Sequence, residues 1–523
     1  MASRRRLLPT VVPAAALLIG LLAWAGCSGS TQPDLTIVVI SLDTTRPDHL
    51  SAYGYDRETT PTLARLASEG ALFKNARSTT SWTLPSHMSL FTGLPPGLHD
   101  VVIDFQILDE GRRTLGEVFQ DGGYRTLGVF SGPYVHGRYG FDRGMDFYER
   151  GTQEPMLFDI PIEQRNRQMG TREHASHREV TSPRIVDRAL NLLALDDTER
   201  NLVFLHFFDP HYDFRAPSKL VRRFSDPAYA GKISGNGIAS DPDLLAGRID
   251  DSDRAQVQAL YDAELAFVDQ NIARLLETLK AEGRLENALV VITGDHGEEF
   301  WENGRFGHRA GLRDEVLRVP LIVWGPGLVP AGRVIEDDVA IYDVLPTLID
   351  YAGLPEEPAI YGRSLKPLID GKPQPPRPLT AALSFFPAEL KGYYILHQSM
   401  VLDGMKLVRR VHVAWAPQTQ SYLGGEWDAD SVEFELYDVR EDPGESRNLV
   451  GSGDPREKRM LEAFADETRR QKQALASFHP QGSGSAPDVD MDLMEMMAQL
   501  GYAAQAEPEP PPTAPDEPPG DGR

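Results

Sequence analysis

Cysteine is nearly absent from this sequence, because Cys27 is the single one among 523 residues. If Cys27 serves as an anchor, no thiol remains for a disulfide, for catalysis or for zinc binding. Basic residues are also few, with 53 Lys and Arg against 77 Asp and Glu and a net charge of −24. Nucleic-acid phosphates require a basic face, so this balance argues against a nucleic-acid partner. Hydrophobic residues make up 41% of the chain, which is enough for one large domain and a smaller one.

The first residues have the pattern of an export signal. Arg4–Arg6 precede an apolar stretch over residues 7–25, and the arginines also resemble a twin-arginine signal. Cys27 directly after this stretch resembles a lipoprotein cleavage site. An uncleaved anchor is the alternative, since the stretch nearly spans a bilayer. Both alternatives predict an exported protein, periplasmic or at the cell surface, that is tethered to the membrane through an N-terminal lipid or anchor.

Apolar, β-branched runs alternate with helical patterns along most of the chain. This alternation predicts an α/β fold, a doubly wound and mostly parallel sheet with helices on both faces. The runs typical of buried parallel strands cover residues 35–40, 126–130, 202–208, 288–293 and 320–324. The helical patterns cover residues 60–69, 114–121, 182–195, 254–282 and 343–352.

The pattern changes after about residue 375, where shorter stretches predict a small C-terminal α+β subdomain with an antiparallel sheet. Its expected strands cover residues 393–396, 399–402, 405–411 and 434–437. The last residues are acidic and rich in proline, so they cannot form a core and are expected to be mostly disordered. We therefore expect a signal over 1–27, a tether over 28–34, a large domain over 35–375, a subdomain over 376–480 and a tail over 481–523.

Polar residues follow three of the predicted strands. Asp43 follows the first, Asp209 and His211 follow residues 202–208, and Asp295 with His296 follows residues 288–293. Ligands of such sheets bind beyond the carboxyl ends of the strands. A buried carboxylate there must be paired, used as a helix cap or bound to a metal. An Asp and a His side by side can give one oxygen and one nitrogen to a cation, although a simple loop pair is the commoner explanation.

A further segment, SWTLPSHMSLFTG over residues 81–93, places Thr83 before a helix that is expected to begin near Pro85. Thr83 could simply cap that helix. A threonine hydroxyl becomes a nucleophile only when a metal or a base activates it. The free N–H groups of the helix would then face a bound oxyanion.

This segment resembles the nucleophile segment of the sulfatase family, within the alkaline phosphatase superfamily. Sulfatases oxidise a Cys or Ser at this place to formylglycine, whereas Thr83 is a secondary alcohol, so no formylglycine can form. Other stretches resemble sulfatase landmarks in the expected order over roughly residues 35 to 450. They are Arg318–Val323, Asp343–Leu348, Tyr361–Leu365, Glu435–Asp438, Asp442–Pro443 and Asn448–Leu449.

The resemblance implies one divalent cation bound by Asp43, Thr83, Asp295 and His296. Thr44 stands where sulfatases carry a second Asp. The cation is expected to be Mn, Zn or Ca, and His296 in place of the usual Asn of calcium sulfatases shifts the expectation from Ca towards Mn or Zn. A second metal remains possible at Asp209, His211 and His308.

The resemblance also implies a substrate pocket. His87 stands in place of an arginine and could contact Thr83 or the substrate, or simply face a neighbour on its helix. His211 is expected to bind the ester or to protonate the leaving group. His308, in place of a lysine, is assigned to catalysis and, together with the adjacent Arg309, to substrate binding.

The expected enzyme is a hydrolase of sulfate or phosphate-type esters in which Thr83 attacks in line. A phosphoester or phosphonate is favoured, because a sulfated threonine has no easy hydrolytic exit. The alternatives are a true sulfatase without formylglycine, a phosphoethanolamine or phosphoglycerol transferase, and an inactive tethered binding protein. The substrate is expected to be a small-molecule, glycan or lipid-headgroup ester, and the oligomeric state is left open.

Overall fold

The computed structural model describes residues 34–103, 106–153, 179–195, 198, 200–238, 241–385, 393–414 and 431–478. The predicted signal, the Cys27 anchor, residues 28–33 of the tether and the C-terminal tail lie outside these ranges. Within them, no helix combines the length and the apolar character needed to cross a membrane.

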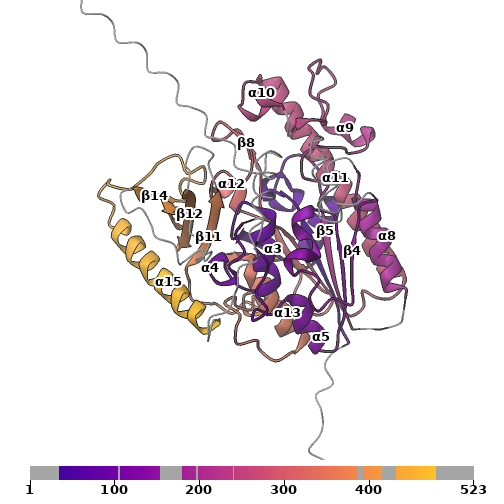
Figure 1. Cartoon of the computed structure of the whole chain (residues 1–523). Coiled ribbons are helices and arrows are strands. Elements are labelled where there is room, and N and C mark those ends of the chain that lie inside the picture. Colours follow the sequence, from indigo (N-terminus) through magenta and orange to yellow (C-terminus); the bar gives the residue numbers. More distant parts are fainter. Residues whose placement is uncertain are drawn as a thin grey trace, which may run out of the picture.

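An eight-stranded sheet forms the centre of the molecule (Figure 1), in the order β10-β2-β9-β6-β1-β5-β3-β4. The strands are β1 (Thr36–Leu42), β2 (Ala71–Arg77), β3 (Arg125–Phe130), β4 (Phe147–Arg150), β5 (Asn201–Phe207), β6 (Ala288–Gly294), β9 (Leu321–Trp324) and β10 (Arg333–Ala340). All neighbouring pairs are parallel except those of β9, which runs antiparallel to β6 and β2. The parallel direction predicted for residues 320–324 was therefore wrong, because an apolar run buried on both faces carries no information about direction.

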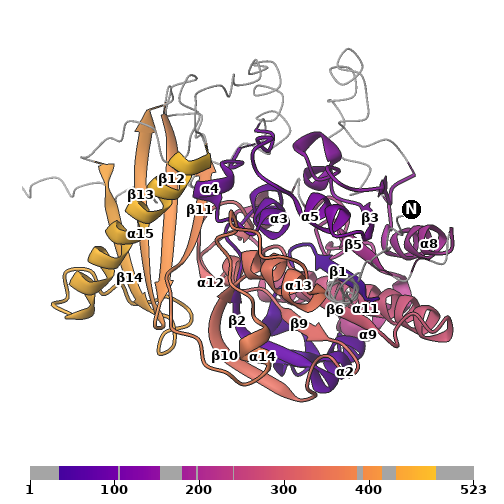
Figure 2. The same ribbon diagram turned by 90° about the horizontal axis from the view of Figure 1, so that it is seen from below.

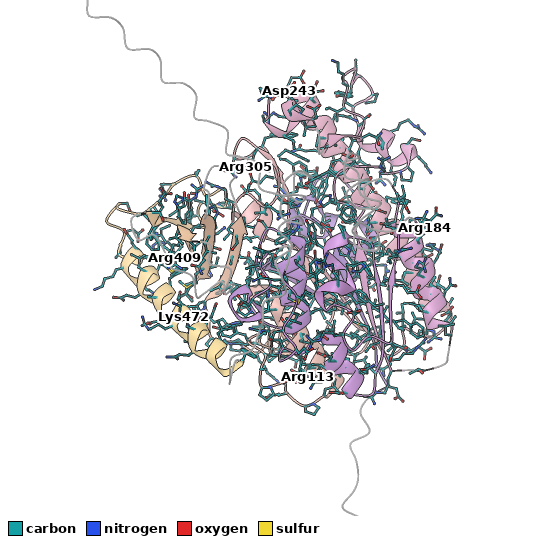
Figure 3. All side chains as sticks on the ribbon, viewed as in Figure 1. Arg113, Arg184, Asp243, Arg305, Arg409 and Lys472 are labelled. Atoms are coloured by element: carbon teal, nitrogen blue, oxygen red, sulfur yellow. The ribbon has the colours of Figure 1, made fainter. Side chains whose placement is uncertain are left out.

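Helices cover both faces of this sheet, as predicted (Figure 2). Side chains alternate along β1, so Ile37 and Val39 pack on one face while Val38 and Ile40 pack on the other. The first face is covered by α3 (Thr83–Thr92), α5 (Leu115–Asp121) and α13 (Val344–Ala352), and the second by α2 (Pro61–Glu69), α8 (Ser182–Leu193) and α11 (Asp251–Ala281). Apolar side chains fill the space between these layers (Figure 3).

The predicted helices are confirmed apart from their ends. The helix α11 begins before residue 254, because the carboxylate of Asp250 accepts a hydrogen bond from the Asp253 N–H at 2.9 Å and caps it. The short elements that complete this region are α4 (Pro96–His99), α9 (Ser218–Phe224), α10 (Pro242–Leu245), α12 (Asp314–Leu317), α14 (Lys366–Ile369) and the hairpin β7 (Glu299–Phe300) with β8 (Phe306–Gly307).

The C-terminal part forms an antiparallel sheet, as predicted, and it has four strands in chain order, the first of which the sequence did not predict. Its strands are β11 (Leu379–Phe385), β12 (Tyr393–Leu402), β13 (Met405–Ala414) and β14 (Glu433–Asp438), and α15 (Arg456–Phe478) lies across them (Figure 2). The strands expected over 393–396 and 399–402 are one strand, β12. The two-residue turn between β12 and β13 is Asp403-Gly404, with positive φ angles of 53° and 75° that suit this hairpin. Ala382 of β11 donates its N–H to the carbonyl of Thr79 at 2.8 Å, just before α3.

Candidate active site

The candidate site lies where β1 and β6 end side by side. These strands are parallel, and Leu42 pairs with Gly294, so the residues that follow them meet at one edge of the sheet. Asp43, Asp295 and His296 are all buried, and one ligand atom from each lies within 4.8 Å of the others. The sequence predicted this juxtaposition from the two strand ends.

Hydrogen bonds hold this cluster in a fixed orientation. Oδ1 of Asp295 accepts from the N–H groups of Thr44 at 3.0 Å and His296 at 2.8 Å. Thr44 has a φ of 47°, an uncommon conformation for a β-branched residue, and in it the N–H reaches Asp295. Nδ1 of His296 lies 2.9 Å from the carbonyl of Gly297, so the proton is on Nδ1 and the lone pair on Nε2.

The electrostatics of the cluster favour a cation. Among the described residues, no donor is in hydrogen-bonding geometry with either carboxylate oxygen of Asp43 or with Oδ2 of Asp295. Burial and then the charge of Glu298 raise the pKa of Asp43, and burial and then Asp43 raise that of Asp295. Buried carboxylates without partners are costly, whereas a divalent cation accepts their oxygens and the Nε2 lone pair of His296. The donor set therefore fits a bound metal.

Thr83 lies directly beside this cluster. The helix α3 begins at Thr83 itself, its N-cap is Trp82, and no side chain caps it. The helix therefore begins two residues before Pro85, and Thr83 is its first residue rather than its cap. The Thr83 hydroxyl instead lies 3.2 Å from Nε2 of His296. Hydroxyl oxygen and imidazole nitrogen thus converge on the place where the carboxylates would hold a cation.

His87 is fully buried beneath the cluster. Its Nδ1 lies 2.9 Å from the carbonyl of Thr83 and its Nε2 lies 2.8 Å from Oγ of Ser41. The contact to Thr83 is thus to its backbone rather than to its hydroxyl. Both ring nitrogens have protein partners, so these contacts lend no support to the predicted substrate role of His87, which stays a prediction.

Three imidazoles line up next to Thr83. The ring centroids of His296 and His308 are 4.5 Å apart, and those of His308 and His211 are 5.1 Å apart. Nδ1 of His308 lies 2.9 Å from Oε1 of Glu298, which leaves the lone pair on Nε2. The structure thus brings both histidines to the side of the cluster where the sequence predicted them, while their roles remain predictions.

Arg309 is held close to the start of α3. Its guanidinium carbon lies 4.1 Å from the ring centroid of Trp82, and the backbone N–H of Arg309 donates to the carbonyl of Ser81 at 3.1 Å. A cation over the face of an indole is stabilised by the charge distribution of the ring. Arg309 therefore brings a fixed positive charge next to the segment that precedes Thr83.

Asp209 does not contribute to a metal site in this arrangement. Oδ1 accepts from the N–H and the hydroxyl of Thr181, and Oδ2 accepts from the N–H of Ser182 at 2.7 Å. Both oxygens thus cap the start of α8. These bonds lend no support to the second metal that the sequence left possible at Asp209, His211 and His308, which stays a prediction. The other candidate group among the described residues is His87, His206 and Asp295.

Sequence reasoning missed two buried residues of the site. Nε2 of His206 lies 3.2 Å from Oδ2 of Asp43, and Glu298 contacts His308. His206 stands inside the apolar run of β5, where an imidazole is easily taken for a core residue. The signal that could have found it is its register, because His206 pairs with Ser41, two residues before Asp43 on the neighbouring strand.

A mostly parallel sheet with a carboxylate–imidazole cluster at the ends of its strands and a hydroxyl at a helix N-terminus fits a metal-assisted ester hydrolase. The comparison with family models is more specific. The sulfatase model matches residues 36–354, so the chain belongs to the sulfatase family. The model of the C-terminal region of N-sulphoglucosamine sulphohydrolase matches residues 297–473.

Individual relatives act on two kinds of ester. The chain is 24% identical to N-acetylglucosamine-6-O-sulfatase of Bacteroides thetaiotaomicron, over 88% of this chain and 90% of that protein. It is 22% identical to an arylsulfatase of Clostridium perfringens, over 81% and 91%. The solved phosphonate monoester hydrolase of Agrobacterium radiobacter has a TM-score of 0.64 at 20% identity, over 84% and 96%. The chain is therefore an ester hydrolase whose fold is shared by sulfatases and phosphonate monoester hydrolases.

Proposed function

We propose that the protein hydrolyses a phosphoester or phosphonate ester by in-line attack of Thr83. The observation that carries this proposal is the position of the Thr83 hydroxyl, 3.2 Å from Nε2 of His296 and not engaged in capping α3. A threonine that only capped the helix would direct its oxygen to the N–H groups of α3 instead. The hydroxyl thus points to the cluster of Asp43, Asp295 and His296.

Asp43, Asp295, His296 and the Thr83 oxygen would hold one divalent cation, which when bound lowers the pKa of a hydroxyl and stabilises negative charge on oxygen. The imidazole in the donor set favours Mn or Zn over Ca, because Ca prefers oxygen ligands only. Glu298 and Asp43 add negative charge to the same buried space, which strengthens the attraction for a cation.

The remaining groups have separate tasks at the reacting ester. The free N–H groups of the first turn of α3 face the oxyanion, and Arg309 adds its charge beside Trp82. Nδ1 of His308 is held by Glu298, so we assign the Nε2 lone pair to accept a proton from the attacking water. We assign protonation of the leaving oxygen to His211.

The choice of phosphorus over sulfur rests on Thr83. A phosphorylated threonine can be released by water, whereas a sulfated threonine has no easy hydrolytic exit. The phosphonate monoester hydrolase among the structural neighbours supports this choice. A true sulfatase that acts without formylglycine is the second candidate, because the family and the N-acetylglucosamine-6-O-sulfatase relative favour it. Transfer to a lipid headgroup instead of water is a third.

The test is a comparison of rates on an aryl sulfate, a phosphate monoester, a phosphodiester and a phosphonate monoester. The wild type should prefer the phosphorus esters, and Thr83→Ala should lower kcat by roughly 10³-fold or more. Thr92→Ala, which removes a buried hydroxyl from the other end of α3, is the matched control and should keep the activity. Turnover of the sulfate alone, or full activity of Thr83→Ala, would falsify the proposal.

We also place the enzyme outside the cytoplasm, attached to the membrane through Cys27. The apolar stretch that ends just before this single cysteine supports the assignment. Fractionation of expressing cells should find the wild type with the membranes and Cys27→Ala in the soluble exported fraction. A Cys27→Ala variant that stays in the membrane fraction would favour the uncleaved anchor instead.

A further inference from the structure

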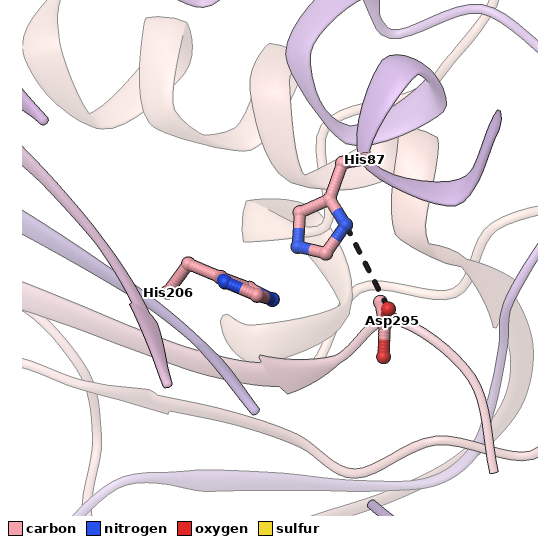
Figure 4. Close-up of side chains that lie close together, drawn as sticks. All are labelled: His87, His206 and Asp295. Carbon is pink, nitrogen blue, oxygen red and sulfur yellow. Dashed lines mark ion pairs between the residues drawn. The ribbon is translucent and has the colours of Figure 1, made fainter. Parts of the chain in front are cut away.

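A second group of side chains shares Asp295 with the proposed metal site, and its two histidines have no task in the proposed reaction. His87, His206 and Asp295 have ligand atoms within 4.8 Å of one another (Figure 4). The two imidazole rings are 4.8 Å apart and nearly perpendicular. Such a group could bind a second cation, or it could serve the first one. The positions of the ring protons decide between these alternatives.

The proton of His206 is fixed by a backbone amide. The N–H of Gly132 points at Nδ1 of His206 at 3.2 Å. An amide N–H only donates, so Nδ1 carries the lone pair and the proton of the neutral ring is on Nε2. Nε2 therefore presents an N–H, and it lies 3.2 Å from Oδ2 of Asp43.

The position of the ring proton of His87 also follows from its hydrogen-bond partners. Its Nδ1 lies 2.9 Å from the carbonyl of Thr83, which only accepts, so the proton is on Nδ1. The same nitrogen is 3.7 Å from Oδ2 of Asp295. The lone pair on Nε2 is taken by the Ser41 hydroxyl. Neither histidine thus offers a lone pair toward the carboxylates, and a second cation has no nitrogen ligand between them.

Position 132 requires a glycine because a side chain would not fit there, and not because of its backbone conformation. Its φ is −93°, which any residue adopts. A Cβ at this position would lie 2.7 Å from Cε1 of His206 and 3.1 Å from Cδ2 of Phe208. Any larger residue would push the imidazole away. The glycine thus lets the amide approach Nδ1 closely enough to fix the tautomer.

We propose that His206 is a positioning residue for Asp43, whose Nε2–H holds Oδ2 of the carboxylate so that Oδ1 faces the cation. The inference rests on the proposed metal site. In this structure Nε2 and Oδ2 are within reach but not aligned as a full hydrogen bond, and neither has a hydrogen-bond partner among the described residues. A small rotation of the carboxylate toward a cation completes the bond. Hydrogen bonds to ligating carboxylates typically change metal affinity by about 10- to 100-fold.

The experiment is calorimetric titration of MnCl₂ into the full-length protein after removal of metal with a chelator. Wild type should bind one ion. His206→Asn keeps an acceptor for Gly132 but has no donor that reaches Asp43, and its Kd should rise by about 10- to 100-fold. His206→Gln, whose amide nitrogen can take the place of Nε2, should recover most of the affinity. Gly132→Ala removes no polar side chain and should weaken binding in the same direction as His206→Asn.

A matched control and a folding measurement keep the result specific. His397→Asn makes the same change in a buried histidine of β12 and should leave the Kd unchanged. Far-ultraviolet circular dichroism of each metal-free variant reports whether it is folded. Unchanged affinity in folded His206→Asn, or no recovery in His206→Gln, overturns the inference while the metal site stands. Two ions in wild type and one in His206→Asn show a second metal instead. A wild type that binds no ion overturns the proposed metal site, and this inference with it.

Discussion

Two of the places where carboxylates are buried in this molecule differ in their surroundings. Between the central sheet and β13, Asp314 lies 2.9 Å from the guanidinium of Arg77 and 3.0 Å from the ammonium of Lys406, which also contacts Glu445 at 2.6 Å. At the ends of β1 and β6, neither Asp43 nor Asp295 has a Lys or Arg within ion-pair distance among the described residues.

The two places shift carboxyl pKa values in opposite directions. Burial alone would raise the pKa of Asp314, but Arg77 and Lys406 together bring it below its ordinary value. Burial and then Glu298 raise the pKa of Asp43. Both carboxyl groups are buried, so the presence or absence of neighbouring Arg and Lys side chains decides the direction of the pKa shift. The cluster around Asp314 is complete, because Arg77 and Lys406 balance its negative charge. The cluster of Asp43 and Asp295 is incomplete, because its balancing positive charge has to come from a bound cation.

The largest expected effect tests the complete cluster. Lys406→Met leaves Asp314 and Glu445 buried with less compensation, and removal of one partner of a buried pair costs about 3–5 kcal/mol. Urea unfolding followed by circular dichroism should show this loss. Lys366→Met, which breaks an exposed pair with Asp370, should cost at most about 1 kcal/mol. A loss as small for Lys406→Met would mean that the cluster does not hold the two sheets together.

The next effect tests the incomplete cluster. Free Mn²⁺ at 100 times its Kd should stabilise the wild type against unfolding by about 2.7 kcal/mol, because the unfolded chain has no site. Asp43→Asn should lose this gain, and without metal it should be no less stable than the wild type, since it removes a buried charge that has no partner. The same denaturant series with and without Mn²⁺ measures both. A marked destabilisation of metal-free Asp43→Asn would show that its carboxylate is compensated after all.

The smallest effect is the pH dependence, and it has opposite signs in the two clusters. The raised pKa of Asp43 makes the folded, metal-free protein bind a proton more tightly than the unfolded chain, so stability falls as pH rises from about 3.8 through the raised pKa. A tenfold difference in proton affinity between the two states corresponds to about 1.4 kcal/mol of stability. The contribution of Asp314 is instead present above 3.8 and is lost as pH falls through its lowered pKa.

Unfolding free energies of the metal-free wild type and Asp43→Asn, measured from about pH 4 to pH 8, isolate the first contribution. The difference between them should grow as pH rises and should vanish when Mn²⁺ is bound. A difference that stays flat over this range would mean that Asp43 is ionised throughout and that another group neutralises it.

The same contrast separates what the sequence predicted from what it did not. The cluster of Asp43, Asp295 and His296 was predictable, because each residue follows an apolar run and parallel strand ends share one edge. Asp314 and Lys406 gave no such signal, since they come together across elements far apart in the chain. The strands β2 and β10 were missed because charged residues such as Lys74 interrupt their apolar patterns.

The role of His206 shows a further limit of sequence reasoning. The sequence around an imidazole in an apolar strand does not indicate which ring nitrogen carries the proton. The tautomer follows from an amide at Gly132, which a different strand and turn bring to the ring. The start of α3 at Thr83 was missed for a related reason, because Pro85 is the strongest local signal and the helix accommodates it within its first turn.

The backbone hydrogen bond from Ala382 to Thr79 has a practical consequence for protein engineering. It joins the first strand of the C-terminal sheet to the segment that leads into Thr83, and Lys406 anchors the same sheet to Asp314. A gene fragment that stops before residue 376 would therefore lack the strand that hydrogen-bonds to the segment before Thr83. We therefore expect an active fragment to need the C-terminal sheet, and swaps between homologues should exchange both parts together.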